Sequence, residues 1–201
     1  MIGVIVGTGP SLTKEQIKLA ELAKKEGRAK LFGANNAVFH VELDVVHACN
    51  FQWYDYYAHI VKDMPLDKWT TRPEIGKKYP WVRYIREEWI YGLSTNPDYI
   101  AAHHGTGPQI INIAYLFYGI TRFLLIGWDM RHKGKRHFFG DGEYPEPLRH
   151  FTRNLGPNGE LIGLIKEMET IKPSEYGIEI INCTPGSAMT HFPMGNLEDL
   201  I

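Results

Sequence analysis

Short apolar runs, each ending in a glycine or polar turn, dominate the pattern of hydrophobic and polar positions along this chain. The first run covers Ile2–Val6 and stops at Gly7-Thr-Gly-Pro-Ser11. A continuous apolar run of this length is typical of a strand that is buried on both faces of a sheet. Residues 13–26 then have the periodicity of an amphipathic helix, with a capping box from Thr13 to Gln16 and Gly27 as its stop.

The same pattern returns along the rest of the chain. It predicts further strands at residues 30–34, 43–48, 122–126 and 177–182, helices at 51–62 and 109–118, and a partly helical segment at 151–171. Prolines interrupt residues 64–97, which we expect to form an irregular helical insertion. Alternating strands and helices predict an α/β fold, a single Rossmann-like domain over residues 1–201 with a mainly parallel sheet.

Several predicted strands finish in turns that could hold a ligand. These turns are Gly7–Ser11, Asn35-Asn36, Asn50, Gly127–Asp129 and Thr184–Ser187. Ligands of open parallel sheets bind at the carboxyl ends of the strands. If the strands are parallel, the five turns lie along one edge and form one binding site.

The first of these turns favours a nucleotide. Glycines let backbone amides approach a phosphate closely, and the start of the following helix adds partial positive charge. The turn is not a P-loop, because no Gly-Lys-Ser/Thr follows, and it lacks the third glycine of a dinucleotide fingerprint. Asn35-Asn36 also stand where such a fingerprint has an acidic residue. A plain strand-to-helix turn that binds nothing is the competing interpretation.

Composition and charge narrow the function classes. The chain has 201 residues, 44% hydrophobic, and a formal net charge of −1, which argues against a protein that coats nucleic acid or membrane surfaces. Two cysteines make neither a disulfide framework nor a zinc site. No apolar segment reaches the roughly 20 residues of a membrane span. We therefore expect a soluble, cytoplasmic protein with two buried thiols.

The motifs resemble those of the bacterial lipooligosaccharide sialyltransferases. The resemblance rests on Gly7-Thr-Gly-Pro-Ser-Leu12 with Asn35 after the second strand, on Gly105-Thr-Gly-Pro108 and its apolar helix, on Leu124-Leu-Ile-Gly-Trp-Asp129, and on Cys183-Thr-Pro-Gly-Ser187. Motif order is kept along nearly the whole chain. Similar arrangements occur in phage and bacterial proteins of uncertain function and in pterin pyrophosphokinase-like proteins.

The resemblance implies a variant glycosyltransferase-A-like fold and a set of residues that hold a nucleotide-sugar donor. The donor would be a sugar linked to CMP, and no metal or other cofactor would be needed. The nucleotide-binding residues that it implies are Gly7, Thr8, Gly9, Ser11, Asn35, Asn50, Thr106, Gly107, Gly127, Asp129, Thr184 and Ser187.

The sequence departs from that family at the catalytic positions. Where the family has two tyrosines for the leaving phosphate, this chain has approximately Arg131 and His137, which can stabilise the same charge. The nearest candidates for the general base are His150 and His137. The irregular spacing of His137, Asp141 and His150 does not favour a metal site.

The leading hypothesis is therefore a metal-independent, sialyltransferase-like glycosyltransferase. Two alternatives stay open: a pterin pyrophosphokinase-like phosphotransferase that needs magnesium, and a non-catalytic nucleotide-binding protein of phage type. The sequence specifies neither the acceptor, for which a modified nucleic-acid base remains one option, nor whether the chain forms a homo-oligomer.

Overall fold

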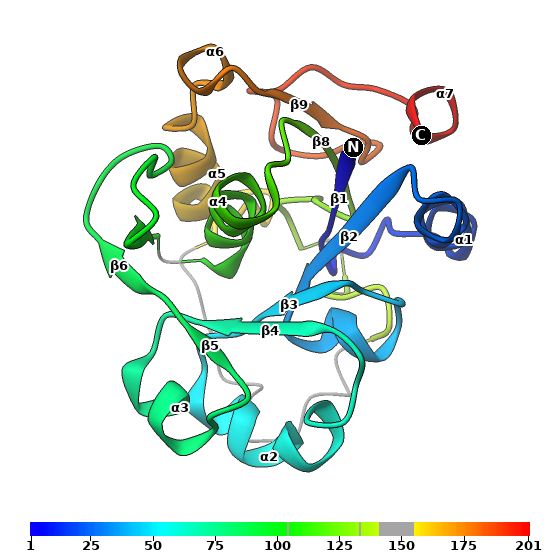
Figure 1. Cartoon of the computed structure of the whole chain (residues 1–201). Helices are drawn as coiled ribbons and strands as arrows, with labels where there is room; N and C mark the ends of the chain where they lie inside the picture. Colours follow the sequence, from blue (N-terminus) through cyan, green and yellow to red (C-terminus); the bar gives the residue numbers. More distant parts are fainter. Residues whose placement is uncertain (104, 133, 141–154) are drawn as a thin grey trace.

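A seven-stranded sheet, in which every pairing is parallel, forms the centre of the chain (Figure 1). The computed structural model describes residues 1–103, 105–132, 134–140 and 155–201. In spatial order the strands are β5 (Arg83–Tyr84), β4 (Asp67–Thr70), β3 (Val45–His47), β2 (Ala29–Ala34), β1 (Ile2–Val6), β8 (Arg122–Ile126) and β9 (Glu179–Asn182). The predicted α/β, Rossmann-like architecture is confirmed.

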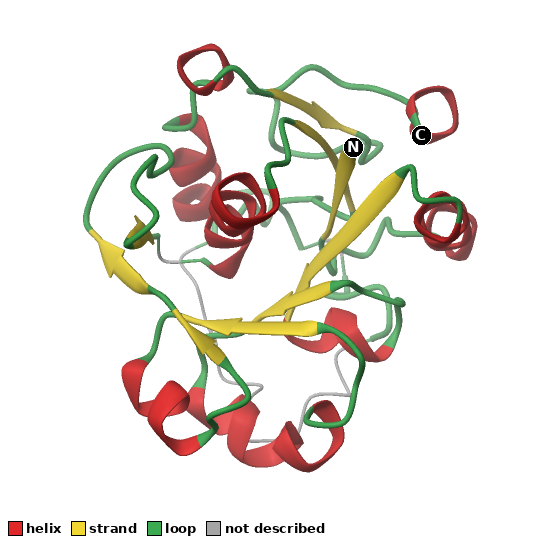
Figure 2. Ribbon diagram, in the orientation of Figure 1, coloured by secondary structure: helices red, strands yellow, loops and turns green. Residues whose placement is uncertain are grey.

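Helices cover both faces of this sheet, as Figure 2 shows. One apolar core lies under α1 (Lys14–Lys25), α2 (Phe51–Val61), α3 (Pro73–Lys78) and α7 (Leu197–Leu200), together with the 3-10 turn η1 (Asn35–Phe39). The other lies under α4 (Thr106–Tyr118) and α5 (Ile162–Glu169), near α6 (Pro173–Tyr176) and the two-stranded parallel sheet of β6 (Arg86–Glu88) and β7 (Tyr99–Ala101). The central strands are apolar on both faces because both faces are covered.

The order of the strands reverses beside β1. The chain steps outward from β1 through β2, β3 and β4 to β5, and then returns to place β8 on the other side of β1. Ile2–Val6 pairs in register with Arg122–Ile126, so β1 and β8 end side by side. A reversal of this kind opens a crevice at the carboxyl ends of the strands, which is where ligands bind in such sheets.

The start of α1 and the end of α4 both carry capping features. Thr13 Oγ1 accepts a hydrogen bond from the Gln16 amide, and Gln16 Oε1 accepts one from the Thr13 amide, each at 3.2 Å, which completes the predicted capping box. Gly119 ends α4 in the left-handed conformation, with φ of 63°. Among the described residues, no helix is long and apolar enough to cross a membrane.

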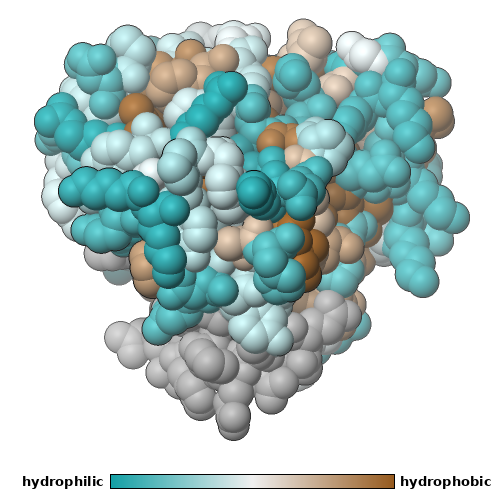
Figure 3. Space-filling model, turned by 60° about the horizontal axis from the view of Figure 1, so that its bottom comes forward, coloured by the Kyte–Doolittle hydropathy of each residue, from teal (hydrophilic) through white to brown (hydrophobic). Residues whose placement is uncertain are grey.

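Residues 64–97 differ from the expected insertion in one respect. Besides α3 and part of the small sheet, the segment supplies β4 and β5, which extend the central sheet on its β3 side. Hydrophilic side chains cover much of the face drawn in Figure 3, and hydrophobic residues show between them in several places.

Candidate functional site

A cleft of about 620 Å³ lies at the carboxyl ends of β1, β2, β3 and β8. The turns that follow these four strands line it together with the start of α4 and the segment after β8. The predicted convergence of strand-end turns is therefore realised for four of the five. Of the residues predicted to bind a nucleotide, those that line the cleft are Gly7, Thr8, Gly9, Asn35, Asn50, Thr106, Gly107, Gly127 and Asp129.

The turns after β1 and β8 are joined through their backbones. The Gly7 amide donates to Ile126 O at 2.8 Å, and the Gly9 amide donates to Gly127 O at 2.9 Å. A Cβ atom at either Gly7 or Gly9 would overlap Gly127 O. The glycines are thus required by the close approach of two turns, and the amides of Gly7 and Gly9 are already used within the protein.

Asp129 locks the same two turns together. Its carboxylate accepts hydrogen bonds from the Ser11 hydroxyl at 2.8 Å and from the Ser11 amide at 3.2 Å. A Cβ at Gly9 would overlap Asp129 Oδ2. Ser11 does not line the cleft, but its hydrogen bonds hold Asp129, which does.

Thr184 and Ser187, predicted to lie near a base, instead hold the turn that carries Trp128. Thr184 Oγ1 accepts from the Trp128 amide at 2.9 Å, and Ser187 Oγ donates to Trp128 O at 2.6 Å. Neither residue lines the cleft. Trp128 does line it, and its indole is fixed by a 3.0 Å hydrogen bond from Nε1 to Ile5 O.

Positive charge gathers on the segment after β8. Arg131, His132, Arg136 and His137 all line the cleft. His137 Nδ1 lies 2.9 Å from Thr8 Oγ1, and the Phe138 amide donates to Thr8 O at 3.0 Å, so this segment docks on the first glycine turn. The imidazole of His137 also stacks on Phe139, with ring planes 5° apart.

Arg131 carries a buried donor that lacks a protein acceptor. Within the described part of the chain, its Nε is buried and has no hydrogen-bond partner. An unsatisfied buried donor on a charged group costs free energy, so it favours occupation by an acceptor. Nearby, hydrogen bonds from Asn158 lower the pKa of Glu160, and the charge of Arg131 contributes to the same shift.

The start of α4 brings further donors to the cleft. Thr106 and Gly107 form its first turn, where backbone amides have no partner inside the helix. The N-cap residue is Gly105, which has no side chain to cap this end. A Cβ at Gly107 would stand 2.7 Å from the Trp128 ring, so glycine permits the contact between α4 and the β8 turn. Cations and a helix start on one cleft suit an anion such as phosphate.

Two residues of the cleft have strained backbones. Asn35 and Met130 have φ of 49° and 52°, and among the described non-glycine residues only these two have positive φ. Left-handed backbone outside glycine is found preferentially at ligand sites. Asn50, by contrast, caps α2, since its Oδ1 accepts from the Gln52 amide at 2.9 Å.

Several other titratable and aromatic residues of the chain bear on this site. His150, together with Asp141, lies outside the described residues. Trp53 and Tyr54 are both buried in the core, although Trp53 also reaches the cleft wall. His103 Nε2 contacts Gly92 O at 3.1 Å, which is a structural role. No group of three or more side chains suited to a metal occurs among the described residues.

The residues that line the cleft without having been predicted from the sequence include Phe51 and Cys49. Cys49 had a usable signal, because it directly follows a predicted strand and precedes Asn50. His132 and Arg136 also line the cleft, but they belong to a polar loop whose direction cannot be read from periodicity.

Comparison with known proteins adds no identification. No protein-family model, no curated protein and no solved structure matches this chain.

Proposed function

We propose that this protein is a nucleotide-sugar-dependent glycosyltransferase, sialyltransferase-like and independent of metal, whose donor phosphate binds beside Arg131. The observation that carries the proposal is the buried Nε of Arg131, which has no hydrogen-bond partner among the residues that the structure describes, in a cleft at the switch point of the sheet. A guanidinium in that position selects for a phosphate or carboxylate ligand.

The chemistry follows from where charge develops. When the bond between sugar and phosphate breaks, the departing phosphate gains negative charge. Arg131 and His137 would stabilise this charge, helped by the first-turn amides of α4. The acceptor hydroxyl needs a base, and His137 and His150 are the candidates for that role. The sugar–oxygen bond to the acceptor would then form as its proton passes to the base.

Ring-shaped groups of the donor have suitable walls in the cleft. Phe51, which is 40% exposed, lines it, and Trp128, which is 6% exposed, lines it with a smaller accessible surface. Aromatic faces of this kind stack on a base or a sugar. Asn35, held in its left-handed backbone, lies at the same cleft and offers an amide for hydrogen bonds to the nucleoside.

Binding of nucleotides tests the proposal directly. We expect cytidine monophosphate to raise the melting temperature in the presence of EDTA, and more than uridine, guanosine or adenosine monophosphate does. Stabilisation that requires magnesium would instead favour the phosphotransferase alternative. No shift with any nucleotide would overturn the donor-binding proposal and leave a non-catalytic role.

A matched pair of arginine variants tests the residue that carries the proposal. Arg131→Gln should weaken cytidine monophosphate binding by roughly 10-fold to 100-fold, the loss of one charge-assisted interaction of about 1.5–3 kcal/mol. Arg122→Gln is the control, because Arg122 begins β8 and pairs with Glu179 at the amino ends of the strands, whereas the cleft lies at their carboxyl ends. Isothermal titration of both variants gives the comparison, and equal affinities would contradict the role of Arg131.

Turnover provides the second readout. The wild-type chain, supplied with a CMP-linked sugar, should release cytidine monophosphate, and Arg131→Gln should lower kcat more than it raises KM, since the charge develops in the transition state. Unchanged turnover in Arg131→Gln would remove Arg131 from the catalytic assignment.

A further inference from the structure

His47 and Cys49 meet at the inner wall of the cleft. His47 ends β3 and is completely buried, and Cys49 follows two residues later and lines the cleft. Their Nε2 and Sγ atoms are 3.2 Å apart. Nothing in the proposed glycosyl transfer uses either side chain.

The neighbours of His47 require a proton on each of its ring nitrogens. Nδ1 lies 3.2 Å from the carbonyl oxygen of Trp69, and Nε2 lies 2.8 Å from Oε1 of Gln109. The Gln109 amide cannot be turned round, because its Nε2 donates to a carboxylate oxygen of Glu87 at 2.9 Å. Both oxygens that face the imidazole are therefore acceptors, and either neutral form would point a lone pair at one of them. The third atom in reach is Cys49 Sγ, 3.2 Å from Nε2.

Cys49 is placed to supply the counter-charge. Its Sγ lies 3.1 Å from the hydroxyl of Thr71, and the Thr71 amide also donates to it. Cys49 stands immediately before the cap of α2, an eleven-residue helix whose start favours negative charge. His47 Nε2, the Thr71 amide and the Thr71 hydroxyl can all donate to the sulfur, while Gln109 Oε1 faces it as an acceptor at 3.4 Å.

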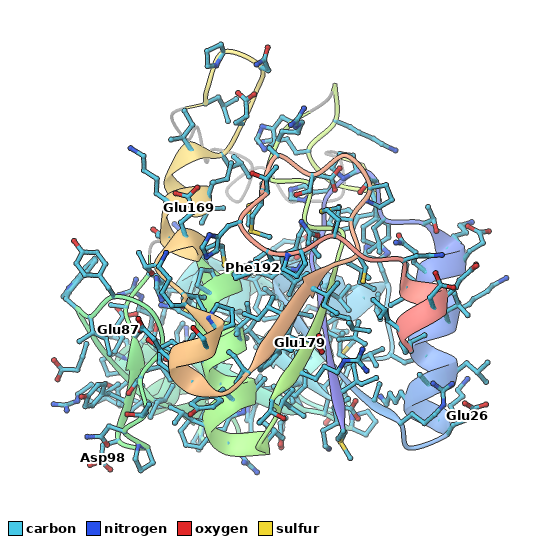
Figure 4. All side chains as sticks on the ribbon, turned by 90° about the horizontal axis from the view of Figure 1, so that it is seen from above. Glu26, Glu87, Asp98, Glu169, Glu179 and Phe192 are labelled. Atoms are coloured by element: carbon cyan, nitrogen blue, oxygen red, sulfur yellow. The ribbon has the colours of Figure 1, made fainter. Side chains whose placement is uncertain are left out.

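Other charged and titratable groups around the pair leave this arrangement intact. Glu87 is linked to His47 only through Gln109 and pairs with Arg72 at 3.3 Å. It comes from β6, on the side of the molecule away from Glu26 of α1 (Figure 4). The hydroxyl of Tyr54 donates to Trp69 O, and burial, with the charge of Cys49, raises its pKa so that it stays neutral.

Burial disfavours the charged forms of both His47 and Cys49, but the interactions of the two side chains with each other and with their neighbours outweigh this effect. Burial would raise the pKa of Cys49, but the charge of His47 and hydrogen bonds from His47 and Thr71 bring it below its usual value. Burial would likewise lower the pKa of His47, while the charge of Cys49 and hydrogen bonds with Cys49, Gln109 and Trp69 hold it above the usual value.

We propose that His47 and Cys49 form an imidazolium–thiolate pair, and that Cys49 is a modification site for small disulfides that enter the cleft. In this exchange the Cys49 thiolate attacks one sulfur of the disulfide and forms a new S–S bond. The original S–S bond breaks, and its electron pair leaves with the other sulfur as a thiolate, which takes a proton from solvent. Cys49 is oxidised, the small disulfide is reduced, and His47 keeps both protons.

Cys183 is a control within the same chain. It is buried, with 2% of its surface exposed, and burial raises its pKa to about 11. It does not line the cleft. Since the thiolate is the reacting form, Cys183 should stay inert under conditions in which Cys49 reacts.

The first experiment follows the reaction of the whole protein with dithiodipyridine as a function of pH, with peptide mapping of the modified residue. We expect Cys49 to carry the label and its rate to rise with a midpoint clearly below pH 8.5, the ordinary thiol value. A titration of thiolate ultraviolet absorbance in Cys183→Ala should give the same midpoint. A midpoint at or above the ordinary value, or equal labelling of Cys183, would overturn the proposal.

Variants show whether the reactivity of Cys49 comes from its pairing with His47 or only from its accessibility in the cleft. His47→Gln should lower the rate at pH 7 by at least tenfold, because a thiol of ordinary pKa is only a few per cent ionised there. If that variant does not fold, Thr71→Val, which removes one donor to the sulfur, should still slow the reaction severalfold. Thr70→Val is its matched control, because the Thr70 hydroxyl accepts from the Arg72 amide instead. Equal rates for the two threonine variants would count against the thiolate.

Because Cys49 lines the cleft, its modification should block the proposed nucleotide binding. This prediction rests on the proposed function. The mixed disulfide should abolish the thermal shift given by cytidine monophosphate, and dithiothreitol should restore it. A shift that survives complete modification would show that the adduct leaves the nucleotide site open. If the unmodified protein gives no shift, the proposed function fails while the reactivity of Cys49 is still judged by its pH profile.

Discussion

At the scale of single residues, the structure separates glycines that are needed from glycines that are not. Gly9 lies where Gly127 O and Asp129 Oδ2 leave no room for a side chain. Gly163 lies in α5, and a Cβ there would meet nothing within 4 Å. The two positions therefore have opposite expectations for the same substitution.

Gly9→Ala should lower the free energy of unfolding by about 1–3 kcal/mol, the usual cost of forcing an extra methyl group into a tightly packed place. It should also weaken nucleotide binding, because the turns after β1 and β8 must separate. Gly163→Ala should instead raise the free energy of unfolding by up to about 1 kcal/mol through helix propensity. Urea unfolding of both variants measures the difference, and a neutral Gly9→Ala would show that the turns are loosely joined.

Much of the candidate site could be predicted from residues that end strands, but their roles could not. The turns after β1, β2, β3 and β8 were read from apolar runs that stop at glycine or asparagine, and these four turns do meet. The engagement of the Gly9 amide by Gly127 O depends on two segments more than a hundred residues apart. The same holds for Gln109 of α4, which meets His47 of β3 only in the folded chain although the two residues are far apart in sequence.

At the scale of elements, Asn50 shows how a predicted ligand residue can serve its helix. Its Oδ1 accepts from the amides of Gln52 and Trp53 at the start of α2. It also lines the cleft, where its amide nitrogen could donate to a ligand. The two roles use different atoms of one side chain.

Asn50→Ala should lower the free energy of unfolding by about 1 kcal/mol, within the range of about 0.5–2 kcal/mol for losing a helix cap. Asn50→Asp keeps the capping oxygen and should keep the stability. If the amide nitrogen binds the nucleotide, Asn50→Asp should nevertheless lose affinity for cytidine monophosphate. Denaturation and titration of both variants distinguish cap from ligand, and full stability of Asn50→Ala would exclude the capping role.

Strands were predictable where burial was complete and not where polar groups took part. β8 matches the predicted residues 122–126, since Phe123–Ile126 are all fully buried. β4, with the sequence Asp-Lys-Trp-Thr, carries no apolar run. Its Asp67 accepts from the hydroxyl of Tyr118, and the ammonium of Lys68 donates to Met64 O. Such polar partners exist only in the folded chain, so periodicity could not place β4 in the central sheet.

At the scale of the whole molecule, buried acids should make the fold sensitive to alkaline pH. Burial raises the pKa of Cys183 to about 11, and it also raises the pKa values of Tyr54 and Tyr118 above their ordinary value. For Tyr118, a hydrogen bond to Asp67 adds to the effect of burial. In the unfolded chain these groups lose their protons near pH 9 to 10.

Stability should therefore be unaffected by these groups below about pH 8.5 and should fall as pH rises further. Over that range the unfolded chain binds fewer protons than the folded chain, which makes the slope of unfolding free energy against pH negative. Lys68 and Cys49 oppose the trend, because their pKa values are lowered in the fold.

The variant Cys183→Ala measures how much of the stability lost at alkaline pH is due to Cys183. In the wild type, a shift from 9.0 to about 11 corresponds to an order of 2–3 kcal/mol by the time pH passes the folded value. The variant loses some packing at every pH, but its free energy of unfolding should decline less steeply than that of the wild type between about pH 9 and 11. Urea unfolding at several pH values gives both slopes. Parallel slopes would mean that the Cys183 thiol ionises as readily in the fold as in the unfolded chain, and the alkaline loss would then belong to the tyrosines alone.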